Sequence, residues 1–182
     1  MGANSNIVID TTAPTLVSYN VLFGSQSYNL TTSARTALPW QVTGIQAVFS
    51  KPVNGNSSSL TGVGSVTLSS GNGTNTLTWT LATPLTNLCS VASTVLGTTA
   101  NAVTDLAGNP LNGGSDSSQN LSVLYADFNQ DGIVNSQDLV LVNAARSQAY
   151  NVFADLNGDG VVDANDVNVV RSRVGTSLSC GH

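Results

Sequence analysis

Two short segments near the C-terminal end hold most of the side chains that could do chemistry. All ten acidic residues of the 182-residue chain are aspartates. Seven of them lie in two twelve-residue segments, 127–138 and 155–166, which are offset by 28 residues. Two divalent cations would bring the formal charge from −5 to −1. The acidity of the chain is therefore of the kind expected of metal sites.

Both segments follow the pattern of a calcium-binding loop. Calcium takes roughly six to eight oxygen ligands, and a twelve-residue loop supplies them from positions 1, 3, 5, 7, 9 and 12, with glycine at position 6. Gly132 and Gly160 occupy position 6. The predicted ligands, with carbonyl oxygens at position 7 and a water-mediated contact from Asn135, are Asp127, Asn129, Asp131, Ile133, Asn135, Asp138, Asp155, Asn157, Asp159, Val161, Asp163 and Asp166. Because no His or Cys is among them, zinc and copper are disfavoured. The sequence predicts two bound Ca²⁺ ions.

A helix is predicted after each loop, and none before the first. Residues 137–146 and 165–174 have helical spacing of their apolar side chains. Residues 121–125 have the pattern of a strand and run almost directly into the first loop. Position 12 is Asp rather than Glu, so each loop must close slightly tighter for the shorter side chain to reach an ion.

This arrangement, a loop followed by a helix, twice, without an entering helix, resembles the dockerin module of cellulosomes. The likeness covers residues 126–178 and is to the type I form, which has two EF-hand-like (F-hand) calcium repeats. The resemblance implies a cohesin-domain protein as partner, bound through the helix faces that follow the loops. It also implies a parent protein that acts on polysaccharide, which this module would contact only indirectly.

The helix that follows the first loop offers the more apolar face. Residues 136, 140 and 144 share one side of a helix, and a short helix on a small core cannot bury the whole run 139–142. We therefore expect Val140 to meet the partner, unless it packs on the preceding domain. The predicted partner-binding residues of both helices are Ser136, Gln137, Val140, Ala144, Ala164, Asn165, Asn168 and Arg171.

The first two thirds of the chain has the pattern of β-strands. In residues 76–81, Leu77, Trp79 and Leu81 alternate with threonines, as in a strand with one buried face. Similar runs occur at 15–19, 45–49, 65–68 and 121–125, separated by Asn- and Gly-rich turns. Short strands at this spacing favour an antiparallel sandwich.

Residues 9–15, 49–53 and 103–111 resemble the opening, central and late signatures of bacterial Ig-like modules. The resemblance implies a spacer or a binding platform. The expected fold is two domains, an all-β Ig-like antiparallel sandwich at 10–125 and a small all-α dockerin at 126–178. Residues 1–9 would be a starting or linker segment and 179–182 a tail. Only Ala126 would separate the two domains, so we expect a semi-rigid rod.

Composition excludes some classes of partner. Five basic residues form no patch able to neutralise a phosphate backbone, and no apolar run is long enough to span a membrane. The charge-poor, hydroxyl-rich composition is more typical of secreted β proteins than of cytosolic enzymes. The resemblances imply a bacterial protein that is secreted or held at the cell surface. Cys89 and Cys180 are an even pair, and a disulfide between them stays open.

No credible active site is present in the sequence. Outside the loops only Asp10, Asp105 and Asp116 remain, and the one histidine, His182, is the last residue. We expect a calcium-dependent docking module with an Ig-like spacer, part of a larger secreted protein. The alternative is an Ig-like carbohydrate-binding or adhesive domain with a structural calcium appendage, in which Trp40 and Trp79 could stack on sugars.

Overall fold

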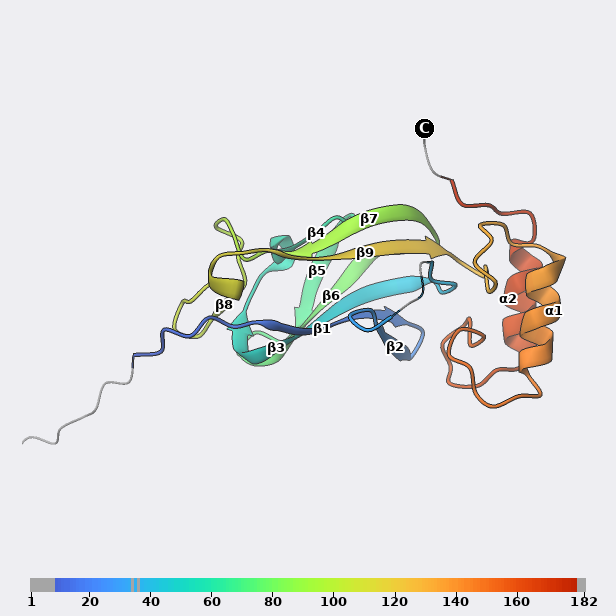
Figure 1. Ribbon diagram of the computed structural model, residues 1–182, viewed down its shortest axis with the longest axis horizontal. Coiled ribbons are helices and arrows are strands. Elements are labelled where there is room, and N and C mark those ends of the chain that lie inside the picture. The colour runs from blue at the N-terminus through green and yellow to red at the C-terminus, as the bar shows by residue number, and fades with distance from the viewer. Residues whose placement is uncertain (1–8, 34, 36, 180–182) are drawn as a thin grey trace, which may run out of the picture.

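The computed structural model describes residues 9–33, 35 and 37–179. Within this part of the chain, strands come first and two α-helices last (Figure 1). The elements are β1 (Leu16–Phe23), β2 (Gln26–Asn29), β3 (Val42–Asn54), η1 (Ser57–Ser59), β4 (Leu60–Thr61), β5 (Val66–Ser70), β6 (Thr74–Leu85), β7 (Asn87–Val95), β8 (Thr104–Asp105), η2 (Leu111–Gly113), β9 (Ser117–Leu124), α1 (Ser136–Ala145) and α2 (Ala164–Arg173).

Two antiparallel sheets form a sandwich. One has the strand order β2-β1-β3-β6-β5, with β8 paired to β3, and the other has the order β4-β7-β9. The chain passes from the first sheet to the second between β6 and β7, which are separated by Thr86 alone. The segment around Leu38 runs parallel to β9 and makes backbone hydrogen bonds to it at Ser122 and Leu124.

The core between the sheets is built from the alternation seen in the sequence. Leu77 and Trp79 of β6 are fully buried, whereas the threonines between them lie nearer to water. The Trp79 indole donates to the Asn56 carbonyl at 2.9 Å, and the Tyr19 hydroxyl pairs with that of Ser93 on the opposite sheet. The buried polar groups therefore have partners, as a dry core requires.

The two helices stand side by side across one end of the sandwich (Figure 1). Both are ten residues long. They share a small core whose buried apolar members are Leu124, Ala126, Val134, Val142, Leu156, Val167 and Val170. Leu124 comes from β9, so this second core continues the sandwich rather than standing apart from it.

The expectation of a small all-α C-terminal domain is wrong. The described chain is mainly β, and its only α-helices are α1 and α2, so most of residues 126–178 is loop. Val152 and Phe153, from the connection between the helices, pack into the core of the sandwich. The physical reason is size: two ten-residue helices bury too little apolar surface by themselves and must draw on the sandwich. We call residues 126–178 the C-terminal segment.

No helix of the described residues is both long and apolar enough to cross a membrane. Cys89 is disulfide-bonded. Cys180, the other half of the pair left open by the sequence, lies outside the described residues, as do His182 and the starting segment 1–8.

An ion-pair cluster fastens the N-terminal strand at the far end of the sandwich. The Lys51 ammonium contacts Asp10 at 2.7 Å and Asp105 at 3.1 Å. Burial raises the pKa of Asp105, but hydrogen bonds from Asn109, Lys51 and Ala107 outweigh it and lower that pKa to about 2. The ionised form of Asp105 is thus favoured by the folded state.

We expect the sandwich to lose stability when Asp105 is protonated. Its pKa falls from 3.8 to about 2 on folding, so its contribution is present above pH 3.8 and is lost as the pH approaches 2. Thermal unfolding followed by tryptophan fluorescence should show the melting temperature falling across this window, and less steeply in Asp105→Asn. A wild-type melting temperature that stays constant through the window would contradict the assignment.

Candidate functional site

Loop one, residues 127–138, is closed by backbone amides that donate to two buried carboxylates. Asp127 and Asp138 are both almost fully buried. Asp127 accepts from the amides of Gln130 at 2.8 Å and Gly132 at 3.0 Å. Asp138 accepts from three amides of the loop, at 2.9, 3.1 and 2.9 Å. Because each carboxylate collects several N–H groups, the chain between them is held in a tight turn.

Loop two, residues 155–166, repeats this network in register. Asp155 accepts from the amides of Gly158 and Gly160, both at 2.9 Å. Asp166 accepts from those of Leu156 at 2.7 Å and Asp163 at 2.8 Å. One contact has no counterpart in loop one: the Tyr150 hydroxyl donates to Asp155 at 2.8 Å. The 28-residue sequence repeat is therefore also a structural repeat.

Positions 9 and 12 of each loop begin the next helix. Asn135 is the N-cap of α1, and its side chain accepts from the Gln137 amide at 2.7 Å while Asp138 closes the capping box. Asp163 and Asp166 play the same parts for α2. The signal was present in the sequence as a polar cap followed three residues later by an acidic side chain. The metal interpretation of these residues missed this helix-starting role.

The more exposed predicted ligands face one another across loop one. The Asn129 side-chain amide donates to Asp131 at 2.9 Å. The Asn135 amide lies 3.5 Å from the same carboxylate and 3.4 Å from the Ile133 carbonyl oxygen. Positions 3, 5, 7 and 9 therefore converge around the Asp131 carboxylate.

The expectation of evident calcium-binding, EF-hand-like sites in the two loops is wrong. In the described part of the chain, no three His, Cys, Asp or Glu side chains come together in a way that could hold a metal ion. The reason lies in the hydrogen bonds: the carboxylates at positions 1 and 12 face backbone amides, and amides of asparagine surround the one at position 5. Nothing in the residues that the structure describes supports the dockerin or cellulosome role that the resemblance implied.

The chemistry of the donors is nonetheless compatible with a hard cation. All twelve predicted ligands offer oxygen, which is what calcium prefers. Rotating an asparagine amide by half a turn exchanges its NH₂ group for its oxygen. In loop one such a rotation of Asn129 and Asn135 would turn their oxygens toward the Asp131 carboxylate, but it would break the hydrogen bonds that these oxygens accept from the Asp131 and Gln137 amides.

Burial of the loop carboxylates favours a nearby positive charge that would neutralise them. Burial raises the pKa of Asp127, against the lowering effect of the Gly132 and Gln130 amides, and the charges of Asp138 and Asp131 raise it further. Burial also raises the pKa of Asp166. In contrast, the hydrogen bond from Asn129 lowers the pKa of the exposed Asp131. The buried carboxylates thus carry their charge at a cost that a nearby cation would reduce.

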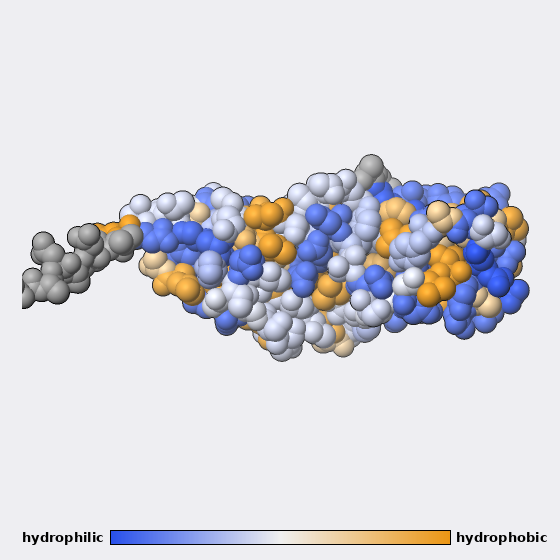
Figure 2. All heavy atoms as spheres, turned by 90° about the horizontal axis from the view of Figure 1, so that it is seen from below, coloured by the Kyte–Doolittle hydropathy of each residue, from blue (hydrophilic) through white to orange (hydrophobic). Residues whose placement is uncertain are grey.

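The predicted partner-binding side chains of the helices all lie exposed. Val140 is 65% exposed and Leu141 is 42% exposed, so Val140 does not pack on the sandwich. Together with Ser136 and Gln137 they line a shallow hollow of about 420 Å³. A second groove, between the helices, is lined by Leu139, Val140, Asn143, Val167 and Arg171. On the face drawn in Figure 2, white and blue residues are interrupted by several separate orange patches.

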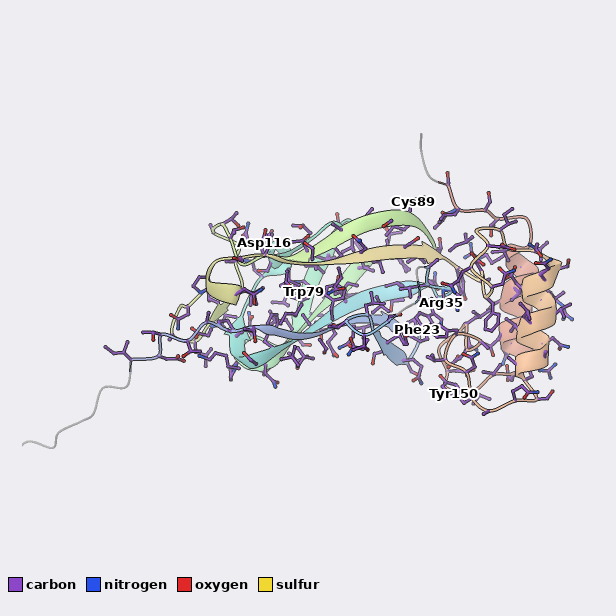
Figure 3. All side chains as sticks on the ribbon, in the orientation of Figure 1. Phe23, Arg35, Trp79, Cys89, Asp116 and Tyr150 are labelled. Atoms are coloured by element: carbon purple, nitrogen blue, oxygen red, sulfur yellow. The ribbon has the colours of Figure 1, made fainter. Side chains whose placement is uncertain are left out.

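Sequence reasoning missed the residues that join the sandwich to the loops. Arg35 and Phe23 lie at the end of the sandwich that faces the helices (Figure 3). Trp40 stacks on Phe23 at 4.1 Å between ring centroids and on Phe153 at 5.3 Å, and its indole donates to the Val152 carbonyl at 3.0 Å. Only the aromatic character of residues 23, 28, 40 and 153 signalled this cluster, because its members are far apart in sequence.

The tryptophans do not form a sugar-binding surface. Trp40 and Trp79 are both fully buried, so neither ring face can stack on a sugar. Asp105 and Asp116 accept hydrogen bonds from backbone amides of nearby turns, for example Gly97 to Asp116 at 2.8 Å. These aspartates stabilise turns, which is the usual role of the residue type.

The comparisons give no relative from which a function could be transferred. No protein-family model, curated protein or solved structure matches the chain.

We expect Asp138→Asn to destabilise the C-terminal segment without any metal present. Asparagine has one acceptor oxygen where three amides donate, and each orphaned buried N–H costs about 1–3 kcal/mol. Urea unfolding in chelator, followed by helical circular dichroism, measures the change. Asp131→Asn is the control, because its exposed side chain should change stability by less than about 0.5 kcal/mol. Equal losses in the two variants would contradict the closing role of Asp138.

Proposed function

We propose that the C-terminal segment is a protein-docking module and that α1 presents its main contact surface. The observation that carries the proposal is the hollow on α1 where two exposed apolar side chains, Val140 and Leu141, lie next to each other. Exposed apolar groups of this kind are characteristic of protein-binding surfaces, because covering them releases water. The proposed partner is a protein of the cohesin type, as the resemblance of the loop-helix repeat implies.

The two helices are not equivalent in this proposal. Val140 on α1 corresponds to Asn168 on α2, 28 residues later. Asn168 accepts a hydrogen bond from the Arg171 guanidinium at 3.0 Å. A partner that covers α2 must therefore replace water around an amide and a charge, whereas one that covers α1 desolvates methyl groups. The proposal assigns the dominant contact to α1.

We also propose that two calcium ions bind the loops, through the mixed carboxylate, amide and carbonyl oxygens that the loop spacing predicts. The support is the all-oxygen donor set and the convergence of Asn129, Asn135 and the Ile133 carbonyl on Asp131. When bound, calcium would supply positive charge and neutralise loop carboxylates. The chain's own contribution is to hold the loop backbone closed through the amides that donate to Asp127 and Asp138.

The proposed role is binding rather than catalysis, in a secreted or cell-surface protein that acts on polysaccharide through other parts. The engagement of Asp10, Asp105 and Asp116 in turns and ion pairs supports this choice. The alternative, a carbohydrate-binding Ig-like domain, loses its expected stacking surface with the burial of Trp40 and Trp79. Binding of the chain to a glycan array would revive that alternative.

We expect Val140→Asp to weaken binding to a cohesin-domain protein by at least about thirtyfold, the size of a hot-spot loss of about 2 kcal/mol. The exposed position keeps the fold intact, which circular dichroism would verify. Asn168→Asp is the matched control at the equivalent position of α2 and should change affinity far less. Surface plasmon resonance with both variants decides the matter. Equal losses, or a loss in Asn168→Asp alone, would show that α1 is not the dominant face.

We expect calcium to stabilise the C-terminal segment selectively. Saturation at a hundred times the dissociation constant adds about 2.7 kcal/mol to the folded state. Excess chelator should therefore reduce the helical circular dichroism while tryptophan fluorescence of the sandwich core is retained. Asp131→Ala and Asp159→Ala should each reduce the number of ions bound in calorimetric titration from two to one. A titration without heat, together with an unchanged helical signal in chelator, would exclude the ions but leave the docking surface untouched.

A further inference from the structure

The turn between β1 and β2 is seated on the backbone of loop two. Ser25 donates two hydrogen bonds to the Gly158 carbonyl oxygen, one from its amide and one from its hydroxyl, each 2.8 Å long. A Cβ atom on Gly24 would come within 2.2 Å of the Asn157 carbonyl oxygen, and one on Gly158 within 2.4 Å of the Phe23 carbonyl oxygen. The turn and the loop therefore meet with no room for a methyl group on either side.

The glycine at position 158 is explained by this contact and not by the loop itself. Position 4 has the same left-handed backbone in both loops, with φ of 67° at Gln130 and 69° at Gly158. Loop one accommodates a glutamine there, at a strain cost of about 1–2 kcal/mol. In loop two a side chain would strike Phe23 as well. Loop two therefore has glycine where loop one has glutamine because the β1–β2 turn packs against this position.

Side-chain contacts of Arg35 and Gln130 join loop one to the sandwich, and the Gln130 side chain accepts from the Ala37 amide at 3.4 Å. The Arg35 guanidinium donates to the carbonyl oxygens of Asp127 at 3.1 Å and Phe128 at 2.7 Å, and to that of Ala37 at 2.8 Å. Its carbon lies 4.4 Å from the centroid of the Phe153 ring, within cation–π range. One side chain of the sandwich thus holds the first residues of loop one and the connection between the helices.

We propose that the sandwich is the template on which the C-terminal segment folds, with the β1–β2 turn holding loop two and Arg35 holding loop one. The segment has few buried apolar residues of its own, and Val152 and Phe153 pack into the core of the sandwich. Its loops stay closed only while both contacts to the sandwich are made. This coupling needs neither an ion nor a docking partner, so it stands apart from the proposed function.

Hydrogen exchange of the whole chain, read by mass spectrometry in chelator, tests the contact from the loop side. Gly158→Ala should accelerate exchange in loop two, in α2 and in the β1–β2 turn by about tenfold or more, equivalent to about 1.4 kcal/mol of local stability. Gly132→Ala is the matched control, because its φ of 83° gives the same kind of strain but no atom lies within 4 Å of the added Cβ. It should leave the β1–β2 turn unchanged.

Gly24→Ala tests the contact from the other side. The change lies in the sandwich, yet exchange in loop two and α2 should accelerate by a similar factor. Gly73→Ala, in the turn between β5 and β6, is its control, since φ is 81° and the space around it is open. Ser25→Ala is a milder variant for use if either glycine variant fails to fold. It removes only the hydroxyl contact, and a smaller acceleration in loop two is expected.

Arg35→Ala should open loop one and the connection between the helices in the same experiment, while β6 stays protected. The proposal is overturned if loop two and α2 exchange at wild-type rates in Gly24→Ala and Ser25→Ala. It is also overturned if Gly158→Ala and Gly132→Ala give the same exchange in the β1–β2 turn. Either result would mean that the C-terminal segment folds on its own.

Discussion

Four buried carboxylates organise the last third of the chain. Asp127, Asp138, Asp155 and Asp166 are all removed from water, and a carboxylate in that state must be met by several donors. The donors are the backbone amides of the two loops. Meeting them bends each loop into its turn and brings position 12 to the first turn of a helix. The start of both helices, and hence the small core between them, follows from this one requirement.

The same hydrogen bonds explain how a loop can keep the spacing of a calcium site without gathering its carboxylates. A carboxylate that closes the backbone has fewer lone pairs left to share with its neighbours. Asp155, which also accepts from Tyr150, is the extreme case. What remains around the mouth of loop one is amide and carbonyl oxygen with one exposed carboxylate, Asp131, whereas loop two offers the exposed Asp159 and the half-buried Asp163. The spacing of the aspartates therefore determines how the loop backbone closes, and any ion site depends on that closed backbone.

The sequence was informative where a pattern is local and weak where a contact is distant. The alternation in residues 76–81 and the spacing in 137–146 and 165–174 correspond to β6, α1 and α2. The prediction of a separate all-α domain failed because hydrophobic periodicity locates helices but gives no information on the contacts of the segment that connects them. Phe153 has the pattern of a loop residue, yet it packs against Trp40, more than a hundred residues earlier. Arg35 carried no signal for its contact with loop one, since neither of its acceptors there is a side chain.

The two repeats differ both in how their loops contact the sandwich and in which side chains their helices expose. Loop two is held by backbone contacts that tolerate no side chain, and the helix that follows it carries polar groups at its exposed positions. Loop one is held by Arg35 and by the contact of Gln130 with Ala37, and α1 leaves Val140 and Leu141 exposed to water. Exposed aliphatic groups lower solubility unless something covers them. The sandwich contacts both repeats, so what distinguishes the two helices is that exposed large apolar side chains lie on α1.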